Sequence, residues 1–437
     1  MRDGSEADTV GRAVPSLVAS PASAEEASAL LRTAAEHALT VVPRGGGSRL
    51  GWGTPVTSCD LLVDMGRMDA VVEHAAGDLV ARVQAGARMG DVASVLAEAG
   101  QEIALDVPPS ATVGGVIASA LAGPRRLRYG SPRDLLIGVT IVRADGTVAH
   151  SGGKVVKNVA GYDLGKLFAG SWGTLGLIVE ATFRLHPLPA ARAFVTSEFA
   201  DVKAATGAVG AAAASPLVAS AVELRRASPG GPVQVGVLLE GSADGVAART
   251  ARMSELLGSG ATVLPEAPEW WPAAKRVPDG GTLIQVSFWV SALESVLDAV
   301  DWAAREHSVA PVVGGAAGAG VVHVGLSPAA DAGAAGRFVG ALRERLSYRS
   351  TSGGSGGVVP PGKHARGSVV VLTAPGPVRE ALGGHGGMTG PVSALRLMRA
   401  VRDQFDPDHR MSPGRFPEVR RGDVEGLSPR GNTAERA

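Results

Sequence analysis

The stretch from Gly152 to Pro189 constrains this chain most, because it sets several glycines beside an apolar run with strand character. It reads GGKVVKNVAGYDLGKLFAGSWGTLGLIVEATFRLHPLP. Glycines at this density next to a strand indicate backbone that lies close against a ligand or another segment. The stretch is therefore typical of a nucleotide-cofactor site, and the rest of the sequence decides which cofactor.

Two further glycine clusters lie upstream. The segment 43–51 (PRGGGSRLG) follows a short β run, and three successive glycines let backbone N–H groups converge on an anion, with Arg44 or Arg49 adding charge. A surface turn between strand and helix explains this segment equally well. The segment 111–119 (ATVGGVIAS) opens a helix whose N-terminus favours a pyrophosphate, although a tightly packed core helix has the same composition.

Spacing argues against the two commonest nucleotide sites. No complete G-x-G-x-x-G occurs in the chain, which argues against a Rossmann site for NAD. The run Gly161–Leu167 (GYDLGKL) is one residue short of a P-loop and lacks its Ser or Thr, which argues against an NTPase.

Composition narrows the class of protein. The 437 residues predict two or more domains, and Lys plus Arg equals Asp plus Glu, which argues against nucleic acid as the main partner. The single Cys59 excludes an internal disulfide and a cysteine-held zinc or iron–sulfur site within this chain. The start lacks a secretory signal, and the uncharged runs 204–222 and 308–330 are not apolar enough to insert in a membrane. We therefore expect a cytoplasmic protein without a transmembrane segment.

Helix and strand patterns alternate through the first half of the chain. Ser23 is a plausible N-cap with Glu26 as its capping-box partner, and Asp145-Gly146 predicts a hairpin turn. The predicted helices and strands of this half are 23–37, 40–43, 79–84, 88–99, 135–143, 147–151 and 176–185.

The pattern of predicted helices and strands changes after Ala190, where we expect a second unit to begin. We predict a long helix at 292–306, a Gly/Ser/Pro linker at 351–362 and a helix at 392–405, before residues 406–417 close the folded part. The predicted organisation is a disordered N-terminus (1–12), a cofactor domain (13–189), a cap or substrate domain (190–390), a C-terminal helix with a returning segment (391–418) and a disordered tail (419–437).

Four ordered motifs resemble a known family. They are R-G-G-G, A-T-V-G-G, R-Y-G-x-x-R-D at 128–134 and G-x-x-G-T-L-G-x-I, and together they resemble the FAD-binding domain of the vanillyl-alcohol-oxidase (PCMH) type over residues 12–189. Phe405-Asp-Pro followed by Ser412-Pro-Gly-Arg resembles the family's C-terminal return segment. The resemblance implies an α+β fold, with FAD between two subdomains and a smaller α+β cap domain.

The resemblance also implies which residues hold FAD. Some members tether the cofactor through a His where this chain has Ser48, so we expect non-covalent FAD, and Ser412 replaces a usual Asn. The expected cofactor residues are Arg44, Gly45, Gly46, Gly47, Ser48, Arg49, Leu50, Pro108, Ser110, Thr112, Gly114, Gly115, Ser119, Gly173, Thr174, Gly176, Ile178 and Ser412.

A narrower resemblance involves the segments 121–126 (LAGPRR) and 152–164 (GGKVVKNVAGYDL). They look like the smaller FAD-binding E subunit of bacterial glycolate oxidase, whereas catalytic-type relatives carry N-A-G-G in place of Leu-Ala-Gly-Pro. This resemblance implies a catalytic flavin subunit and an iron–sulfur subunit as partners, a small 2-hydroxy acid as substrate, and contact with the inner membrane only through partners.

Catalytic residues are harder to assign. Oxidation of a 2-hydroxy acid needs a base and a cation for the carboxylate, and His323 and His385 lie near the family's histidine positions. Gly384 stands where the family has Glu, and no second His lies within ligand spacing of His323, which argues against a metal. A core strand histidine and a loop histidine are the simpler interpretations.

Other residues also allow two interpretations. The pair Trp270-Trp271 either lines a pocket or packs in the core, and Arg125 and Arg126 either bind an anion or form surface salt bridges. Three functions remain open: an FAD subunit of a glycolate oxidase-type complex, which we favour, a self-sufficient D-lactate or 2-hydroxyacid dehydrogenase, and a non-catalytic subunit that binds flavin weakly.

Overall fold

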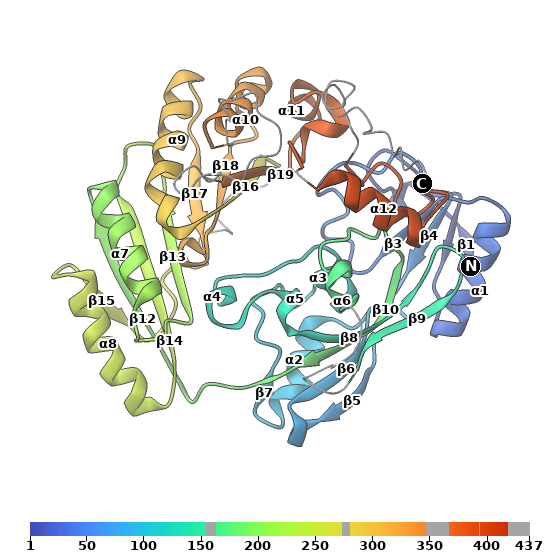
Figure 1. Cartoon of the computed structure of the whole chain (residues 1–437), viewed down its shortest axis with the longest axis horizontal. Helices are drawn as coiled ribbons and strands as arrows, with labels where there is room; N and C mark the ends of the chain where they lie inside the picture. The colour runs from blue at the N-terminus through green and yellow to red at the C-terminus, as the bar shows by residue number, and fades with distance from the viewer. Residues whose placement is uncertain (154–162, 273–279, 347–366, 393, 418–437) are drawn as a thin grey trace, which may run out of the picture.

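The computed structural model describes residues 1–153, 163–272, 280–346, 367–392 and 394–417. Two α+β units lie side by side, the first built from the N-terminal part of the chain and the second from its middle (Figure 1). The predicted α+β class is confirmed. The expected linker at 351–362, the expected tail at 419–437 and most of the segment 152–164 lie outside the described residues. None of the described helices is long and apolar enough to cross a membrane.

The first unit holds two main sheets. One is four-stranded in the order β1-β2-β4-β3, with β2, β4 and β3 parallel, and the other is antiparallel in the order β5-β6-β10-β8-β9. A small sheet pairs β11 with β7. The strands are β1 (Arg2–Asp3), β2 (Leu17–Ala19), β3 (Val41–Arg44), β4 (Leu61–Asp64), β5 (Val71–Ala75), β6 (Val80–Gln84), β7 (Gln101–Glu102), β8 (Leu136–Val142), β9 (Val148–Gly152), β10 (Leu177–Arg184) and β11 (His186–Pro187).

The first helix of this unit starts where the sequence predicts. Helix α1 (Ala24–Glu36) begins after Ser23, whose hydroxyl accepts the N–H of Glu26 at 3.2 Å. The Glu26 carboxylate accepts the N–H of Ala22 at 2.8 Å, one residue before the expected capping-box position. The other helices are α2 (Met89–Ala97), α3 (Val113–Ala118), α4 (Arg126–Tyr129), α5 (Pro132–Leu135), α6 (Gly165–Phe168) and the 3-10 turns η1 (Glu6–Asp8) and η2 (Ala76–Asp78).

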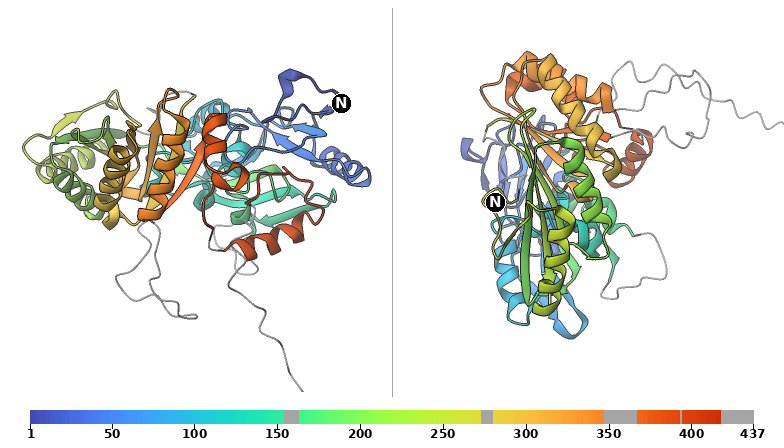
Figure 2. Two further views of the ribbon diagram at one scale, coloured as in Figure 1. Left: turned by 90° about the horizontal axis from the view of Figure 1, so that it is seen from above. Right: turned by 90° about the vertical axis from the view of Figure 1, so that its left-hand side faces the viewer.

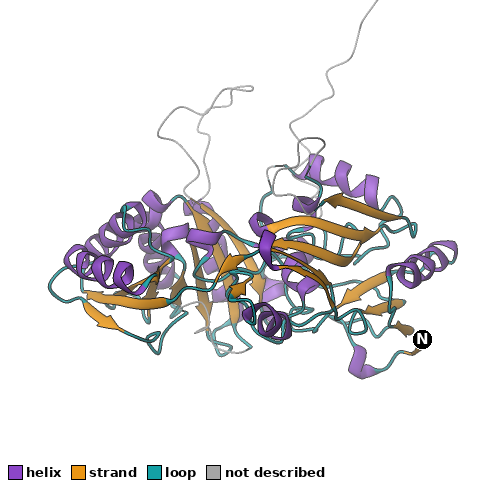
Figure 3. Ribbon diagram, turned by 90° about the horizontal axis from the view of Figure 1, so that it is seen from below, coloured by secondary structure: helices purple, strands orange, loops and turns teal. Residues whose placement is uncertain are grey.

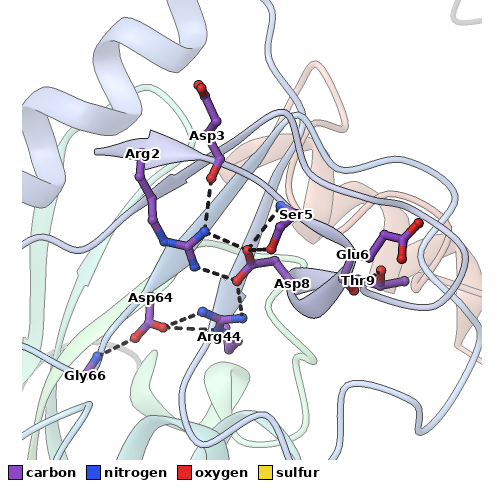
Figure 4. Close-up of polar contacts among 9 residues, drawn as sticks. All are labelled: Arg2, Asp3, Ser5, Glu6, Asp8, Thr9, Arg44, Asp64 and Gly66. Atoms are coloured by element: carbon purple, nitrogen blue, oxygen red, sulfur yellow. Dashed lines mark hydrogen bonds and ion pairs between the residues drawn. The ribbon is translucent and has the colours of Figure 1, made fainter.

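The N-terminal residues differ from the expected disorder. Strand β1 pairs with β2, and Val10 is fully buried. Asp8 accepts two 2.7 Å hydrogen bonds from Arg2 and one of 3.1 Å from Arg44 (Figure 4). These bonds, led by the one from Arg2, hold the pKa of Asp8 below its usual range. A polar, breaker-rich segment is ordered here because its few charges find buried partners that the local sequence does not reveal.

The second unit is built on one antiparallel sheet of eight strands, in the order β15-β12-β14-β13-β17-β18-β16-β19. Helices α7 to α10 cover one face of this sheet (Figures 2 and 3). The elements are β12 (Ala191–Phe199), α7 (Val202–Ala214), β13 (Ala221–Arg226), β14 (Val233–Gly241), α8 (Ala243–Leu257), β15 (Thr262–Leu264), β16 (Thr282–Phe288), η4 (Val290–Ala292), α9 (Leu293–Glu306), β17 (Val312–Gly315), η5 (Ala317–Ala319), β18 (Val321–Leu326), α10 (Ala332–Leu346), β19 (Gly367–Thr373), α11 (Gly376–Ala381) and η6 (Gly384–Gly387).

The C-terminal segment returns to the first unit. Helix α12 (Leu395–Phe405) places Phe405 edge-on to Phe168 of α6, with ring centroids 5.6 Å apart. Beyond it, Met411 is fully buried and bridges to Val41 of β3. Residues 406–417, which were predicted to end the folded part, therefore lie beside β3, the strand that precedes the first glycine cluster.

The two units meet at Arg125, immediately before α4. Its guanidinium donates to Glu102 at 2.7 Å and to Asp106 at 2.7 Å, and it lies 3.6 Å from Glu240 of β14 in the second unit. Arg128 also donates to the backbone carbonyl of Glu240, at 3.3 Å. Of the two roles considered from the sequence, anion binding and salt-bridge formation, the structure therefore supports salt-bridge formation for Arg125.

Candidate cofactor site

A cavity in the first unit brings the three glycine clusters and the return segment together. Its empty space is about 830 Å³ when the open solvent at its mouth is counted. The expected cofactor residues that line it are Arg44, Gly45, Gly46, Gly47, Ser48, Arg49, Leu50, Thr112, Gly114, Gly115, Ser119, Gly173, Gly176, Ile178 and Ser412. The other three do not line it: Pro108 and Ser110 precede α3, and Thr174 is buried with its hydroxyl donating to the Ser171 carbonyl.

The first glycine loop offers free backbone donors to this cavity. Among the described residues, no hydrogen-bond acceptor is found for the N–H groups of Gly45, Gly46, Gly47 and Ser48. Gly46, Gly47 and Ser48 are exposed, so water can satisfy these N–H groups until a ligand takes its place, and successive N–H groups of this kind form a concave anion site. The loop therefore presents the donor set that a diphosphate requires.

The second cluster works differently from our expectation. Helix α3 has only six residues, and its first N–H groups are already bonded, that of Val113 to Ala87, that of Gly114 to Ala85 and that of Gly115 to the Thr112 hydroxyl. It therefore offers the cavity a close-packed wall rather than a helix N-terminus with open donors. The N–H groups that lack an acceptor among the described residues are those of the glycine loop.

Several of these glycines have no room for a side chain. A Cβ on Gly45 would lie 2.0 Å from the Thr112 hydroxyl, and one on Gly46 would lie 2.9 Å from the Ser110 carbonyl oxygen. Gly173 has φ +74°, and its Cβ would lie 3.0 Å from the Ser412 hydroxyl. Small residues thus allow the loop, α3 and the return segment to approach one another around the cavity.

The arginines of the cavity differ in how their charge is balanced. Arg44 donates to Asp64 at 2.6 Å and to Asp8 at 3.1 Å, so its charge is neutralised by two carboxylates (Figure 4). Arg49 donates to the Ser48 hydroxyl at 3.3 Å and stacks over Trp52, 5.0 Å from the ring centroid. Burial lowers the pKa of Arg49. Of the two arginines named from sequence, Arg49 is the one with charge left for a ligand.

Sequence reasoning missed some of the lining. The residues it did not name are Val42, Pro43, Met65, Ala85, Ala118, Trp172, Leu177 and Arg415. Five of them, Pro43, Ala118, Trp172, Leu177 and Arg415, lie inside segments that were recognised, so their position within a motif was an available signal. Met65 and Ala85 belong to segments without a motif, and only the fold brings them to the cavity.

The third cluster and the return segment hold strained backbone. Trp172 has φ +54° and Ser412 has φ +47°, a left-handed conformation that few residues other than glycine and Asn adopt readily. Ser412 keeps this conformation because its N–H donates to the Val41 carbonyl at 2.8 Å. The left-handed backbone explains why an Asn would suit this position.

Residues 15–152 match the family described as an FAD binding domain, and they contain the first two glycine clusters. The chain carries an FAD-binding domain. The cavity fits this cofactor, since a diphosphate needs the free donors of the glycine loop and the uncompensated charge of Arg49. The FAD-binding domain is also the unit to which the return segment comes back.

Curated relatives match about half of the chain. The glycolate oxidase subunit GlcD of Bacillus subtilis is 34% identical over 218 residues, which are 48% of this chain and 46% of that protein. The mitochondrial D-lactate dehydrogenase [cytochrome] of Arabidopsis thaliana is 33% identical over 211 residues, 48% of this chain and 37% of that protein. The match thus spans less than half the length of these relatives.

Solved structures share the fold around the FAD-binding domain. That of p-cresol methylhydroxylase with substrate bound has a TM-score of 0.69 at 15% identity, covering 92% of this chain and 89% of that one. Chitooligosaccharide oxidase has a TM-score of 0.60 at 16% identity, covering 93% and 92%. The expected PCMH-type fold is confirmed.

The second unit places one histidine near a cation of the FAD-binding domain. His323 lies on β18 between Gln285 and Gly314 of neighbouring strands, and its Nδ1 is buried without a partner among the described residues. Burial, and then the charge of Arg126 on α4, lower its pKa to about 4. His323 is therefore neutral at physiological pH, and its Nδ1 is left without a hydrogen-bond partner among the described residues.

The remaining candidates do not join this pair. The side chain of His385 lies outside the described part of η6. Within the described ranges, no three His, Cys, Asp or Glu residues are grouped to hold a metal ion. Trp271 packs edge-on against Phe194, with centroids 5.2 Å apart, so it lies partly buried against a small apolar cluster of the second unit.

Proposed function

We propose that this chain is the FAD-holding subunit of an oxidoreductase that acts on the CH–OH group of a small 2-hydroxy acid such as glycolate. The observation that carries the proposal is the run of unpaired donors from Gly45 to Ser48, inside a domain of the FAD-binding family. The reaction class is supported by relatives named as a glycolate oxidase subunit and as D-lactate dehydrogenases.

In this proposal the chain works with a catalytic flavin subunit and an iron–sulfur subunit in the cytoplasm. The single Cys59 leaves any cysteine-held iron–sulfur centre to a partner. Any contact with the inner membrane is made by those partners. Because the curated match is to a D subunit, the likeness to the E subunit rests on the segments 121–126 and 152–164.

Bound FAD supplies the acceptor for a hydride and its two electrons. The glycine loop and Arg49 hold its diphosphate, and Ser48 stands where tethered relatives carry a histidine, so the cofactor is not covalently attached. Precipitation with trichloroacetic acid should then leave flavin in the supernatant. Flavin that stays on the pellet would contradict this part of the proposal.

A second candidate is a self-sufficient 2-hydroxyacid dehydrogenase, which one observation favours. Arg126 and His323 come from different units, and Arg126 lies close enough to lower the pKa of His323. A guanidinium can bind the carboxylate of a hydroxy acid, and a neutral imidazole can accept its hydroxyl proton. Under this candidate the pair forms the substrate side of the chain's own active site.

One purification separates these functions. We expect the chain alone to be yellow, and glycolate or D-lactate added without oxygen to leave it oxidised until the partner subunits are present. Rapid bleaching by either acid in the isolated chain, abolished in Arg126→Met and His323→Gln, would instead establish the self-sufficient enzyme. A colourless chain that cannot be reconstituted with FAD would point to the third function, a non-catalytic subunit.

A further inference from the structure

Two arginines that are distant in sequence hold the loop that follows the glycine run. Arg415 of the return segment donates to the carbonyl of Trp52 at 2.7 Å and to that of Leu50. Arg379 of α11 donates to the carbonyl of Gly51 at 3.2 Å. Three successive carbonyls of one loop therefore face guanidinium groups, one of which comes from the second unit.

These arginines lack the charge balance that Arg44 has. Arg415 is 8% exposed and lines the FAD cavity, and no carboxylate within the described part of the chain lies within 4 Å of its guanidinium. Burial, and then the charge of Arg379, lower its pKa to about 10, so it stays cationic at neutral pH. The Nε atoms of Arg49 and Arg379 are also buried without a partner among the described residues.

Carbonyl dipoles orient a guanidinium but do not cancel its charge. A buried cation without a counter-ion is costly, and the cost falls when a ligand brings the negative charge. Guanidinium groups also match the flat, two-oxygen geometry of phosphate and carboxylate groups. A polar cavity wall with unbalanced positive charge is therefore incomplete until it holds an oxyanion.

We propose that Arg415 and Arg49, with Arg379 behind them, form an oxyanion site in the wall of the FAD cavity. Its ligand is either a phosphate of FAD or the carboxylate of an acid that binds beside FAD. The carboxylate as ligand rests on the proposed function, whereas the FAD phosphate as ligand needs only the FAD-binding domain. Arg379 belongs to the second unit and does not line the cavity, so it acts on the site through its charge near Arg415 and its hydrogen bond to Gly51.

Binding to the apoprotein tests the phosphate source. We expect Arg415→Met to weaken FAD binding by about 10-fold to 100-fold, with Arg415→Lys in between, while riboflavin, which lacks phosphate, binds as to wild type. Arg252→Met is the matched control, because Arg252 is an exposed arginine of α8 far from the cavity. Equal losses for FAD and riboflavin, with oxalate binding unchanged, would mean that Arg415 only shapes the loop and would overturn the proposal.

The holoprotein tests the carboxylate source, with oxalate as a probe that cannot be oxidised at a CH–OH group. If the ligand is the carboxylate instead, Arg415→Met should bind FAD as the wild type does but should lose the oxalate-induced change in the flavin spectrum. If this variant does not fold, Arg49→Met is measured in the same way, because Arg49 makes fewer contacts. Unchanged affinity for both FAD and oxalate in a folded variant refutes the site. No turnover enters these measurements, so a chain that binds both probes but oxidises no hydroxy acid would refute the proposed function alone.

Discussion

The FAD-binding domain and the second unit build their candidate sites from different atoms. In the FAD-binding domain the cavity sets unpaired N–H groups, close-packed glycines and left-handed residues such as Trp172 and Ser412 among apolar side chains. In the second unit the candidate residues are single side chains on regular elements, His323 on a strand and Arg379 on a helix. A site made of backbone tolerates few substitutions but leaves a motif, whereas a site made of side chains depends on which residues the fold brings opposite one another.

The largest effect should come from the junction between the two units. Arg125→Met removes the partner of Glu102 and Asp106 and the nearest cation to the buried Glu240. Breaking a buried ion pair from one side costs about 3–5 kcal/mol, so we expect the free energy of unfolding in denaturant to fall by that amount. Arg252→Met should leave it unchanged. A loss below about 1 kcal/mol would mean that solvent already compensates these carboxylates.

The next effect tests the backbone character of the cavity. Gly46→Val places a branched side chain 2.9 Å from the Ser110 carbonyl, in the loop that offers the free donors. We expect FAD affinity to fall about 100-fold or more, equivalent to about 2.7 kcal/mol, while the circular dichroism spectrum stays that of the wild type. Gly77→Val is the control, because a Cβ there meets no atom within 4 Å. Flavin retained by the Gly46 variant would show that the diphosphate lies elsewhere.

A smaller effect tests the environment of His323. Its pKa is lowered to about 4 in the folded protein, against about 6.5 when unfolded, so the unfolded state binds the proton first as pH falls. Stability is therefore fully retained above about pH 6.5 and declines toward pH 4. We expect the wild type to lose about 2 kcal/mol more than His323→Gln between pH 7 and pH 5, measured by urea unfolding at each pH. Parallel pH profiles would mean that His323 is hydrated in solution.

The smallest effect concerns glycine in the second unit. Gly207 lies on the exposed side of α7, where a Cβ meets no atom within 4 Å. Gly207→Ala should raise the free energy of unfolding by about 0.5–1 kcal/mol, because alanine favours the helix, and FAD binding should not change. A destabilised variant would show that this glycine, like those of the cavity, makes room for a neighbouring segment.

Local chemistry made much of the fold predictable. The N-cap at Ser23 and the apolar runs of β8 and β10 depend on neighbours a few residues away, so they can be found in the sequence. The ordered N-terminus could not be found in this way, because β1 pairs with β2 and Asp8 binds Arg44, 36 residues distant, in addition to the nearby Arg2. The strand order of the large sheet is likewise set by contacts between segments that are far apart in the chain.

The candidate site also has one part that the sequence predicts and one part that only the structure shows. Glycine clusters in the sequence indicate the cavity, because close backbone approach and left-handed φ values favour glycine, as at Gly47 and Gly173. Which arginine carries free charge is not a local property. Arg44 and Arg49 look equivalent in the sequence, and only the positions of Asp8 and Asp64 show that Arg44 is already neutralised.

The sequence by itself determined that this chain holds a nucleotide cofactor, and its ordered motifs indicated FAD. The tertiary structure decided where the free donors lie, in the glycine loop rather than at α3, and it set Arg126 near His323 and Arg415 in the cavity wall. The physical reason is the separation along the chain between the residues that interact. Backbone conformation is chosen by adjacent residues, whereas burial and charge balance depend on partners that folding brings from other parts of the chain.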